Sequence, residues 1–307
     1  MTAEEKKYTA MARTIAHEYL NKRGSKIQYK PGGHTNFVFE AKAGKESFII
    51  RIGKDRHKID DFIKEESIIK KAGEFNIPVA AVLEVGSSIV DKPYMIQRKV
   101  NGEESKYHRE RSGIIKQMGA LTAHIHTIAT YGYGGKFSFE KNQPSLFASW
   151  KKYFDDELKV EQRLSILEKY EMITLKDMRK LKSVIALLRQ DNKKPVLHHG
   201  DIRMKNIIVD KSGKIVAVLD WENAVSQPRP FWDLSIALHD LNIDEKQIFL
   251  NGYGMNLKTF MKMSSFYKVF NLLNYARVTE NAVKKHDKKS LLEYKLRLGK
   301  HLDLFCM

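Results

Sequence analysis

Cysteine, proline and long apolar runs are all scarce in this 307-residue chain. It contains one cysteine, Cys306, and so cannot form an internal disulfide or a site with several thiolate ligands, and we expect a protein of the reducing cytoplasm. The longest apolar runs, such as 79–83, have five residues, whereas a membrane-spanning helix needs about 20. Residues 1–7 carry early acids and no apolar segment of signal-peptide length. We therefore expect neither a membrane span nor secretion.

Acidic residues are also in short supply, because 54 Lys and Arg face 37 Asp and Glu and give a formal charge of +17. Such a surface attracts polyanions, which raises nucleic-acid binding as one hypothesis. The cations are spread along the chain, often beside acids, and no known nucleic-acid-binding motif accompanies their densest patch, Lys284, Lys285, Lys288 and Lys289. Solvated helix faces explain the charge better, and we expect no specific nucleic-acid partner.

The hydrophobic pattern is that of a globular protein, and its periodicity changes near residue 100. Before that point we expect helices over 4–21 and 58–75 and strands over 37–42, 47–52, 79–85 and 93–100. After it we expect helices over 106–129, 145–169, 174–190, 231–241, 257–279 and 288–304, interrupted by short strands between 195 and 220. The sequence predicts an α+β fold with a small β-rich lobe over 1–98 and a large, mostly helical lobe over 99–307.

The residues best suited to catalysis lie among the short strands between residues 195 and 220. Asp201 follows His199 and Gly200, Asn206 comes five residues later, and Asp220 ends the second strand of an expected hairpin. We expect the two carboxylates and the amide to converge at the strand ends. Asn206 and Asp220 offer the oxygen ligands that Mg²⁺ prefers, which leaves Asp201 free to act as a base. Phosphoryl transfer from ATP to a hydroxyl is the reaction that needs this set.

Three segments in order carry a more specific signal: HGDIRMKNIIVD at 199–210, VLDWE at 218–222 and PFWDLS at 230–235. Together they resemble the aminoglycoside phosphotransferase and choline kinase-like superfamily of small-molecule kinases. The resemblance implies a protein-kinase-like bilobal fold, ATP or GTP as the phosphoryl donor, and Mg²⁺ as the cofactor. It makes His199 and Asp233 structural supports of the catalytic loop. Arg203 stands where many kinases have a catalytic lysine, so it is either a second catalytic residue beside Asp201 or an outward-facing arginine.

The first hundred residues must then bind the nucleotide. The segment GGHTN at 32–36 resembles the phosphate loop of the family, so we expect Gly33, Thr35 and Asn36 near the phosphates. Arg51 occupies the position at which protein kinases use a lysine to contact the phosphates, and its fork suits bidentate contact.

A cation inside the apolar strand 48–52 needs a partner, because an unpaired buried charge is costly. Glu65, on the expected helix 58–75, is the candidate, with Glu66 as the alternative. Further along, the segment 94–103 resembles the hinge between kinase lobes. We expect Gln97, Arg98 and Val100 at the nucleotide base, contacting it through backbone groups.

The phosphoryl acceptor follows less directly. Only thirteen residues separate Asp220 from Asp233, which leaves no room for the long segment that seats a peptide in protein kinases. We therefore expect a small-molecule hydroxyl: an aminoglycoside-type antibiotic, or alternatively choline or ethanolamine, a macrolide, or a sugar-like molecule. A polycation would need acids, and the candidates are Asp155, Asp156, Glu157 and Glu161, although an exposed helix face explains that cluster more simply. A choline-type cage could draw on Trp150, Tyr153, Trp232 and Tyr267.

Two functions of other classes remain alternatives: a nucleotide-binding pseudokinase that acts as an interaction module, and a basic nucleic-acid-binding protein. The presence of Asp201, Asn206, Asp220 and Arg51 argues against the pseudokinase. Magnesium-dependent consumption of ATP separates the kinase from both alternatives.

Overall fold

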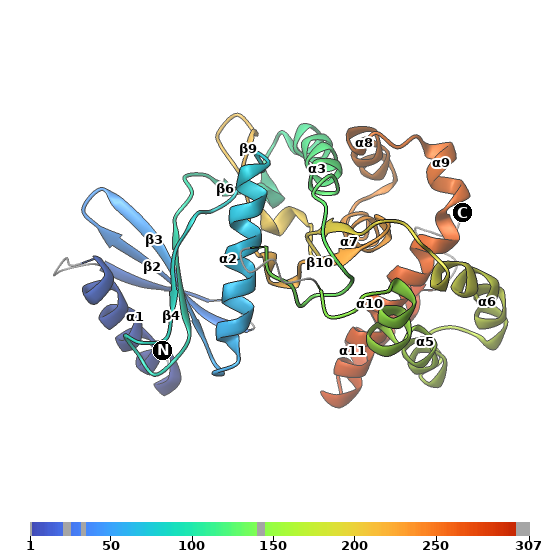
Figure 1. Ribbon diagram of the computed structural model, residues 1–307, viewed down its shortest axis with the longest axis horizontal. Helices are drawn as coiled ribbons and strands as arrows, with labels where there is room; N and C mark the ends of the chain where they lie inside the picture. Colours follow the sequence, from blue (N-terminus) through green and yellow to red (C-terminus); the bar gives the residue numbers. More distant parts are fainter. Residues whose placement is uncertain (1, 21–25, 32–34, 140–144, 299–307) are drawn as a thin grey trace.

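The computed structural model describes residues 2–20, 26–31, 35–139 and 145–298, and it has two lobes (Figure 1). The small lobe is built on a five-stranded antiparallel sheet in the order β1-β2-β3-β5-β4. Its strands are β1 (Lys26–Lys30), β2 (Asn36–Ala43), β3 (Glu46–Gly53), β4 (Val82–Gly86) and β5 (Tyr94–Arg98). Helix α1 (Ala3–Leu20) packs on the sheet, where Tyr8 stacks on Phe37 with ring centroids 4.0 Å apart.

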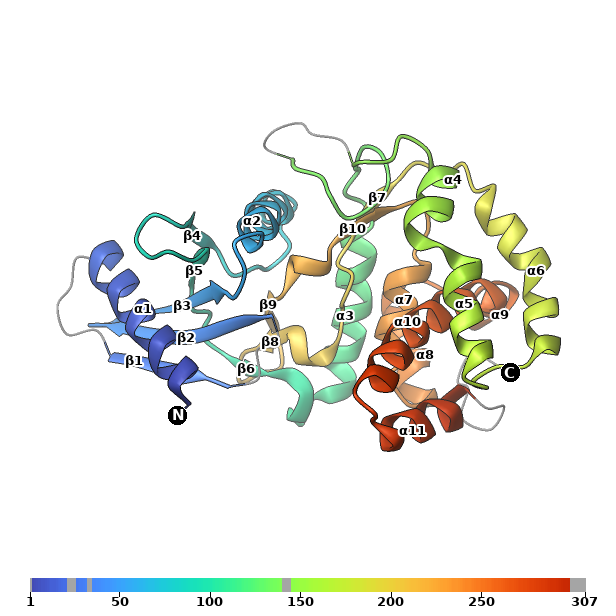
Figure 2. The ribbon, with the colours of Figure 1, turned by 90° about the horizontal axis from the view of Figure 1, so that it is seen from below.

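Helix α2 (Lys58–Glu74) lies between the sheet and the large lobe (Figures 1 and 2). Its buried side chains include Phe62, Glu65, Ile68 and Ile69, which recur at helical spacing and so share one face. The charged Glu65 is fully buried among these apolar neighbours. The fold thus places one carboxylate of α2 behind the central strand β3.

Helices make up most of the large lobe. They are α3 (Arg111–Ile125), α4 (Trp150–Tyr153), α5 (Val160–Lys169), α6 (Leu175–Arg189), α7 (Phe231–Ala237), α8 (Ile243–Tyr253), α9 (Leu257–Lys262), α10 (Ser264–Lys284) and α11 (Lys288–Leu298). Most of the buried side chains of α10 are apolar, and this helix packs against α5, α6, α7 and α11. It therefore forms the centre of the large lobe.

Short strands carry the loops that face the small lobe. Strand β7 (Val196–His198) pairs with β10 (Val225–Gln227), while β6 (Glu103–Glu104), β8 (Ile207–Val209) and β9 (Ile215–Val218) form a second sheet. Val218 also bridges to Val79 at the end of the α2–β4 connection. Both small sheets thus lie where the lobes meet (Figure 2).

The α+β fold with two lobes, predicted from the sequence, is confirmed, but several predicted helices are wrong in detail. The expected helix 145–169 is broken, because a π-helical turn over Phe154–Leu158 and a left-handed Lys159 (φ 47°) separate α4 from α5. The expected helix 257–279 is likewise divided at Met263, and α3 begins at Arg111 after a 3₁₀ turn. No helix in the described part of the chain is long and apolar enough to cross a membrane.

Four elements are missed altogether: β1, β6, β10 and α8. Strand β1 is a short edge strand whose residues are half-buried or exposed. Its Ile27 and Tyr29 alternate with polar residues and pack against the core of the small lobe, so this alternation is the signal that could have located it. Helix α8 begins with a capping box in which the Asn242 side chain accepts from the Glu245 amide and Glu245 accepts from the Asn242 amide. That Asn-x-x-Glu pattern is the sequence signal that could have located the helix.

Candidate active site

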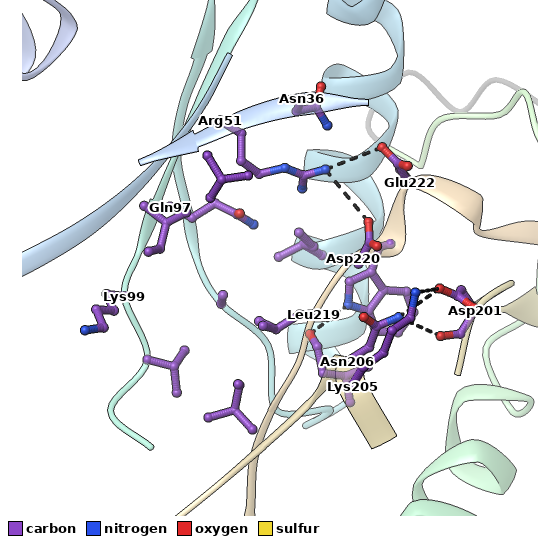
Figure 3. Close-up of a pocket in the computed structure, with 18 of the residues that line it drawn as sticks. Asn36, Arg51, Gln97, Lys99, Asp201, Lys205, Asn206, Leu219, Asp220 and Glu222 are labelled. Carbon is purple, nitrogen blue, oxygen red and sulfur yellow. Dashed lines mark hydrogen bonds and ion pairs between the residues drawn. The ribbon is translucent and has the colours of Figure 1, made fainter. Parts of the chain in front are cut away.

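A cleft of about 620 Å³ opens between the lobes (Figure 3). Small-molecule sites typically occupy about 300–1,000 Å³, so its size suits a ligand as large as a nucleotide. Apolar side chains line it from both lobes, among them Val38 and Ile49 of the small lobe and Ile208 and Leu219 of the large lobe. The predicted residues that line it are Thr35, Asn36, Arg51, Gln97, Arg98, Val100, Asp201, Asn206 and Asp220. Gly33 lies outside the described residues.

Arg51 is the buried cation of the cleft. It lies on β3, and its Nη1 is 2.6 Å from Oε1 of Glu65, which also accepts from the Trp221 amide at 3.2 Å. Burial opposes the charge on Arg51, but the neighbouring carboxylates, Glu65 first, outweigh it and raise the pKa of the guanidinium. The structure thus pairs Arg51 with Glu65, and the ion pair is anchored to the segment that follows β9.

The other end of the guanidinium faces two carboxylates of the large lobe. Nη2 of Arg51 lies 3.8 Å from Asp220 and 3.5 Å from Glu222 (Figure 3). Asp220 has a left-handed backbone (φ 66°), which is uncommon for a residue other than glycine and turns the chain sharply at the end of β9. Burial raises the pKa of Asp220. The positive charge of Arg51 opposes this shift, and the negative charge of Glu222 adds to it. A bound cation would stabilise the charged form of this buried carboxylate.

Asn206 and Asp201 form the second polar group of the cleft. The Asn206 amide nitrogen donates to the backbone carbonyl of Asp201 at 2.8 Å and to its Oδ2 at 3.1 Å. Because the NH₂ group is used in this way, the amide oxygen of Asn206 stays available as an acceptor. The oxygens of Asn206 and Asp220 therefore form a donor set that fits Mg²⁺.

Two cations hold the Asp201 carboxylate. Nε of Arg203 lies 2.9 Å from one oxygen and Nζ of Lys205 lies 2.9 Å from the other. Lys205 lines the cleft, whereas Arg203 lies away from it and also approaches Asp240 at 3.7 Å. Lys205 was not among the predicted site residues, although its place four positions after Asp201 could have indicated it.

Beneath the loop, Asp233 is completely buried. Its two oxygens accept from the amides of His199 and Gly200, both at 2.8 Å, and Oδ2 is also 3.1 Å from Nε2 of His126. Burial alone would raise the pKa of Asp233, but the His126 contact and the nearby histidines lower it well below its ordinary value. Asp233, at the start of α7, thus fixes the backbone that leads into Asp201.

His199 ties the same loop to β9. Its Nε2 donates to the Leu219 carbonyl at 3.0 Å, and its Nδ1 accepts from the Asp201 amide at 3.2 Å. Burial lowers the pKa of His199, in keeping with this neutral ring. Between the two residues, Gly200 has φ 83°, and a Cβ there would lie 1.9 Å from the Asn223 carbonyl. Only glycine fits at this position.

Glu222 is a further cleft residue that the sequence prediction omitted. It accepts from the Thr35 hydroxyl at 3.3 Å and lies 3.3 Å from Nζ of Lys58. These contacts join the phosphate-loop region, α2 and the turn after β9. Its place in the Asp-Trp-Glu segment is the signal that could have identified it.

None of the residues expected for cationic acceptors lines the cleft between the lobes. Trp150, Tyr153 and Tyr267 are buried in the core of the large lobe and so cannot form an open aromatic cage. Asp155 of the acidic cluster is paired with Arg189, through contacts of 2.7 and 2.6 Å.

Comparison with known proteins identifies the family to which the chain belongs. The model of the phosphotransferase enzyme family (APH) matches residues 26–262, which is most of the chain. The chain belongs to this family. No curated protein sequence matches this phosphotransferase.

Solved structures show the same fold. An apo thermostable mutant of aminoglycoside phosphotransferase APH(4)-Ia has a TM-score of 0.70 at 15% identity, covering 93% of this chain and 96% of that one. A further thermostable mutant of that enzyme, in a ternary complex with AMP-PNP and hygromycin B, has a TM-score of 0.69 at 14% identity over 94% and 96% of the two chains. Macrolide 2′-phosphotransferase MphH from Brachybacterium faecium has a TM-score of 0.61 at 12% identity over 95% and 98%. At these identities the likeness concerns the fold.

Proposed function

We propose that this phosphotransferase is a small-molecule kinase that transfers the γ-phosphoryl group of ATP or GTP to a hydroxyl. One observation carries the proposal: Arg51, Asn206, Asp220 and Asp201 line a single cleft, with Arg51 and Asp220 reaching each other from opposite lobes at 3.8 Å. In this proposal Arg51 is the phosphate-binding cation, and Asn206 and Asp220 supply oxygen ligands for a metal. The carboxylate of Asp201 is then free to act as a base. Phosphoryl transfer uses all of them together.

The nucleotide base has a defined place in this proposal. Val38 and Ile49 from one lobe and Ile208 and Leu219 from the other offer apolar surfaces to its two faces. In the hinge, the amide of Arg98 donates to the Ala81 carbonyl and that of Lys99 to the Ser47 carbonyl, so the sheet already uses both. We therefore assign recognition of the base edge to the backbone of Val100, which lines the cleft just beyond them.

At the other end of the cleft we place the phosphates beside Thr35, Asn36 and Arg51. Asn206 and Asp220 would hold Mg²⁺ there, since their oxygens fit it and Asp220 is a largely buried carboxylate beside Glu222 and Asp201. Held by these residues, Mg²⁺ would neutralise charge on the phosphates of the nucleotide.

Asp201 is the catalytic base of the proposed reaction, orienting the acceptor hydroxyl and accepting its proton. Lys205 touches Asp201 and lines the nucleotide cleft, so it is the cation placed to stabilise charge on the transferring group. Arg203, on the side of Asp201 away from that cleft, orients the carboxylate instead. Asp233 and His199 position the loop from below.

A thermal-shift titration with Mg-ATP and Mg-GTP tests the nucleotide site. Ligand at about 100 times its Kd adds roughly 2.7 kcal/mol to the free energy of unfolding. We expect Asp220→Ala and Asn206→Ala to reduce this magnesium-dependent gain, because each removes a ligand oxygen. Asp244→Ala, at an exposed acid of α8, is the matched control and should retain it. A wild-type protein with no magnesium-dependent shift for either nucleotide would contradict the proposed function.

A coupled assay with hydroxylated acceptors, spanning aminoglycosides, choline-like amines, macrolides and sugars, tests the chemistry. With an active acceptor, Asp201→Asn should lower kcat by about 10²–10⁴ while leaving nucleotide affinity nearly unchanged, because only the proton acceptor is lost. Turnover close to wild type would assign the proton to another group. Loss of ATP binding would instead make Asp201 a metal ligand.

A further inference from the structure

A second cavity, of about 190 Å³, lies on the far side of the catalytic loop from the nucleotide cleft. Side chains of α7, α10 and α11 line it together with Arg203, and it shares no lining residue with the nucleotide cleft. Arg203 contacts the Asp201 carboxylate at 2.9 Å. The cavity therefore begins one side chain away from the proposed catalytic base.

The charges on its wall are positive. Two arginines, Arg203 and Arg297, line the cavity, and no carboxylate is among the described residues that line it. Asp240 approaches Arg203 at 3.7 Å and Glu293 approaches Arg297 at 2.8 Å, each from outside the lining, with half of its side chain exposed to solvent. A polycation would meet two guanidinium groups here, whereas an anion would find charge-assisted hydrogen-bond donors.

Between the arginines lies a neutral histidine. Nη1 of Arg297 donates to Nε2 of His239 at 2.9 Å, which requires that nitrogen to be unprotonated. Burial, opposed by Asp240 but reinforced by the charges of Arg203, Arg297 and Lys246, lowers the pKa of His239 to about 4. Burial, more than the neighbouring charges, thus keeps the His239 ring neutral.

The rest of the wall suits hydroxyl groups. Asn271, which is almost completely buried, and Asn274 offer amides from α10, and Tyr275 and Tyr294 offer phenols. The rings are packed in place, since Tyr275 lies 5.4 Å from His239 and 5.7 Å from Tyr294 between centroids. At about 190 Å³ the cavity is smaller than the roughly 300–1,000 Å³ of sites for drug-sized ligands. It therefore fits a molecule of about one sugar ring better than a multi-ring antibiotic.

We propose that this cavity is the acceptor subsite of the kinase and that its acceptor is a small hydroxylated anion, whose carboxylate or phosphate pairs with Arg297 while a hydroxyl reaches Asp201. The inference rests on the proposed function. The hydroxyl oxygen forms a bond to the γ-phosphorus of ATP as the bond from that phosphorus to the β–γ bridging oxygen breaks. ADP leaves with the electron pair of that bond, and the hydroxyl proton passes to Asp201.

The test uses acceptors that share one ring and differ in charge: glucuronate, glucose 6-phosphate, glucose and glucosamine, with kanamycin as the multi-ring polycation. Binding is measured by calorimetry in the presence of Mg²⁺ and a non-hydrolysable ATP analogue, and turnover by ADP release with Mg-ATP. We expect at least one of the two anions to bind and turn over at least tenfold better than glucose, and glucosamine and kanamycin to be the poorest. The two anions distinguish a carboxylate from a phosphate specificity.

Variants at Arg297 locate the effect. Arg297→Gln should weaken binding of the preferred anion by roughly tenfold to a hundredfold, as expected for loss of a hydrogen bond to a charged group, and should weaken binding of glucose much less. Arg297→Lys keeps the charge and should restore part of the preference. Arg179→Gln, at an exposed arginine of α6, is the matched control and should behave as wild type.

The possible results distinguish failure of the acceptor assignment from failure of the proposed kinase function. Equal binding of glucose or glucosamine and the anions, failure of both anions to bind, or an anion preference that survives Arg297→Gln would each overturn the acceptor assignment. In all three cases, stabilisation by Mg-ATP would still support the proposed kinase. Absence of that stabilisation would instead contradict the proposed function itself.

Discussion

Two buried ionic clusters flank the cleft, one in each lobe, and they differ in what surrounds them. Arg51 pairs with Glu65 on one side, but its other nitrogen faces the cleft and two carboxylates at 3.8 and 3.5 Å. Asp233 is enclosed on all sides and accepts from backbone amides of the catalytic loop at 2.8 Å. The same principle, that a buried charge must be paired, leaves one guanidinium nitrogen facing the cleft in the small lobe and fixes the backbone of a loop in the large one.

Replacement of Asp233 should have the largest effect and tests the difference between the enclosed Asp233 cluster and the Arg51–Glu65 cluster. Asp233→Ala leaves two loop amides and His126 without their acceptor, so we expect the free energy of unfolding to fall by about 3–5 kcal/mol. Chemical denaturation measures the loss. Asp233→Asn keeps one acceptor oxygen and should lose less, so it reports on the loop if the alanine variant does not fold. Stability equal to wild type in both variants would contradict a positioning role.

The small-lobe cluster should respond differently when both partners are replaced together. The double variant Arg51→Met, Glu65→Leu removes both charges of the 2.6 Å pair together, and such replacements are often neutral or stabilising. It also takes the nearby cation from Asp220 and the acceptor from the Trp221 amide. We expect the fold to persist but the gain of roughly 2.7 kcal/mol from Mg-ATP at about 100 times Kd to be lost. Thermal shifts with and without nucleotide measure the two quantities separately. A double variant that unfolds would show that the pair is structural, like Asp233.

The smallest expected effect is a loss of stability at acidic pH. His198, packed against His126 with ring centroids 4.4 Å apart and near Asp233, is completely buried, and burial lowers its pKa to about 3. The unfolded chain, with a pKa near 6.5, therefore takes up the proton first. The contribution of His198 to stability should be fully present above pH 6.5 and fall by up to about 1.4 kcal/mol per pH unit below it, and His199 and His239, whose pKa values are also lowered, should add to the slope.

Denaturation midpoints between pH 7.5 and 5 measure this slope, which His198→Leu should reduce. His17→Gln, at a histidine that is half exposed, is the control and should keep the wild-type slope. Arg51, whose pKa is raised, adds no slope in this range. A slope unchanged in His198→Leu would place the acid sensitivity elsewhere.

The sequence predicted the elements whose constraints are local. The β2–β3 hairpin and α2 follow from apolar periodicity and turn residues, and Asp201, Asn206 and Asp220 follow from the spacing within one loop and hairpin. Other elements were missed or wrong for different reasons. Helix α8 and strand β1 carry local signals, a capping box and an apolar alternation, that the prediction passed over. The expected helix 145–169 is instead interrupted at Lys159, whose backbone is left-handed.

Some contacts of the candidate site could also be predicted from the sequence, and others could not. The pairing of Arg51 with Glu65 could be predicted because a cation in an apolar strand needs a neighbour. The contact of Glu222 with Thr35 and Lys58 joins segments more than 150 positions apart in the chain and leaves no local pattern. The cavity behind Arg203 is made by three helices that only the tertiary fold brings together.

The separation of the two cavities has a kinetic consequence. Because they share no lining residue, nucleotide and acceptor can occupy the protein simultaneously, and neither has to leave before the other enters. The reaction should therefore pass through a ternary complex, with double-reciprocal plots that intersect rather than run parallel. ADP should compete with ATP and not with the acceptor, and the phosphorylated acceptor should compete with its own precursor.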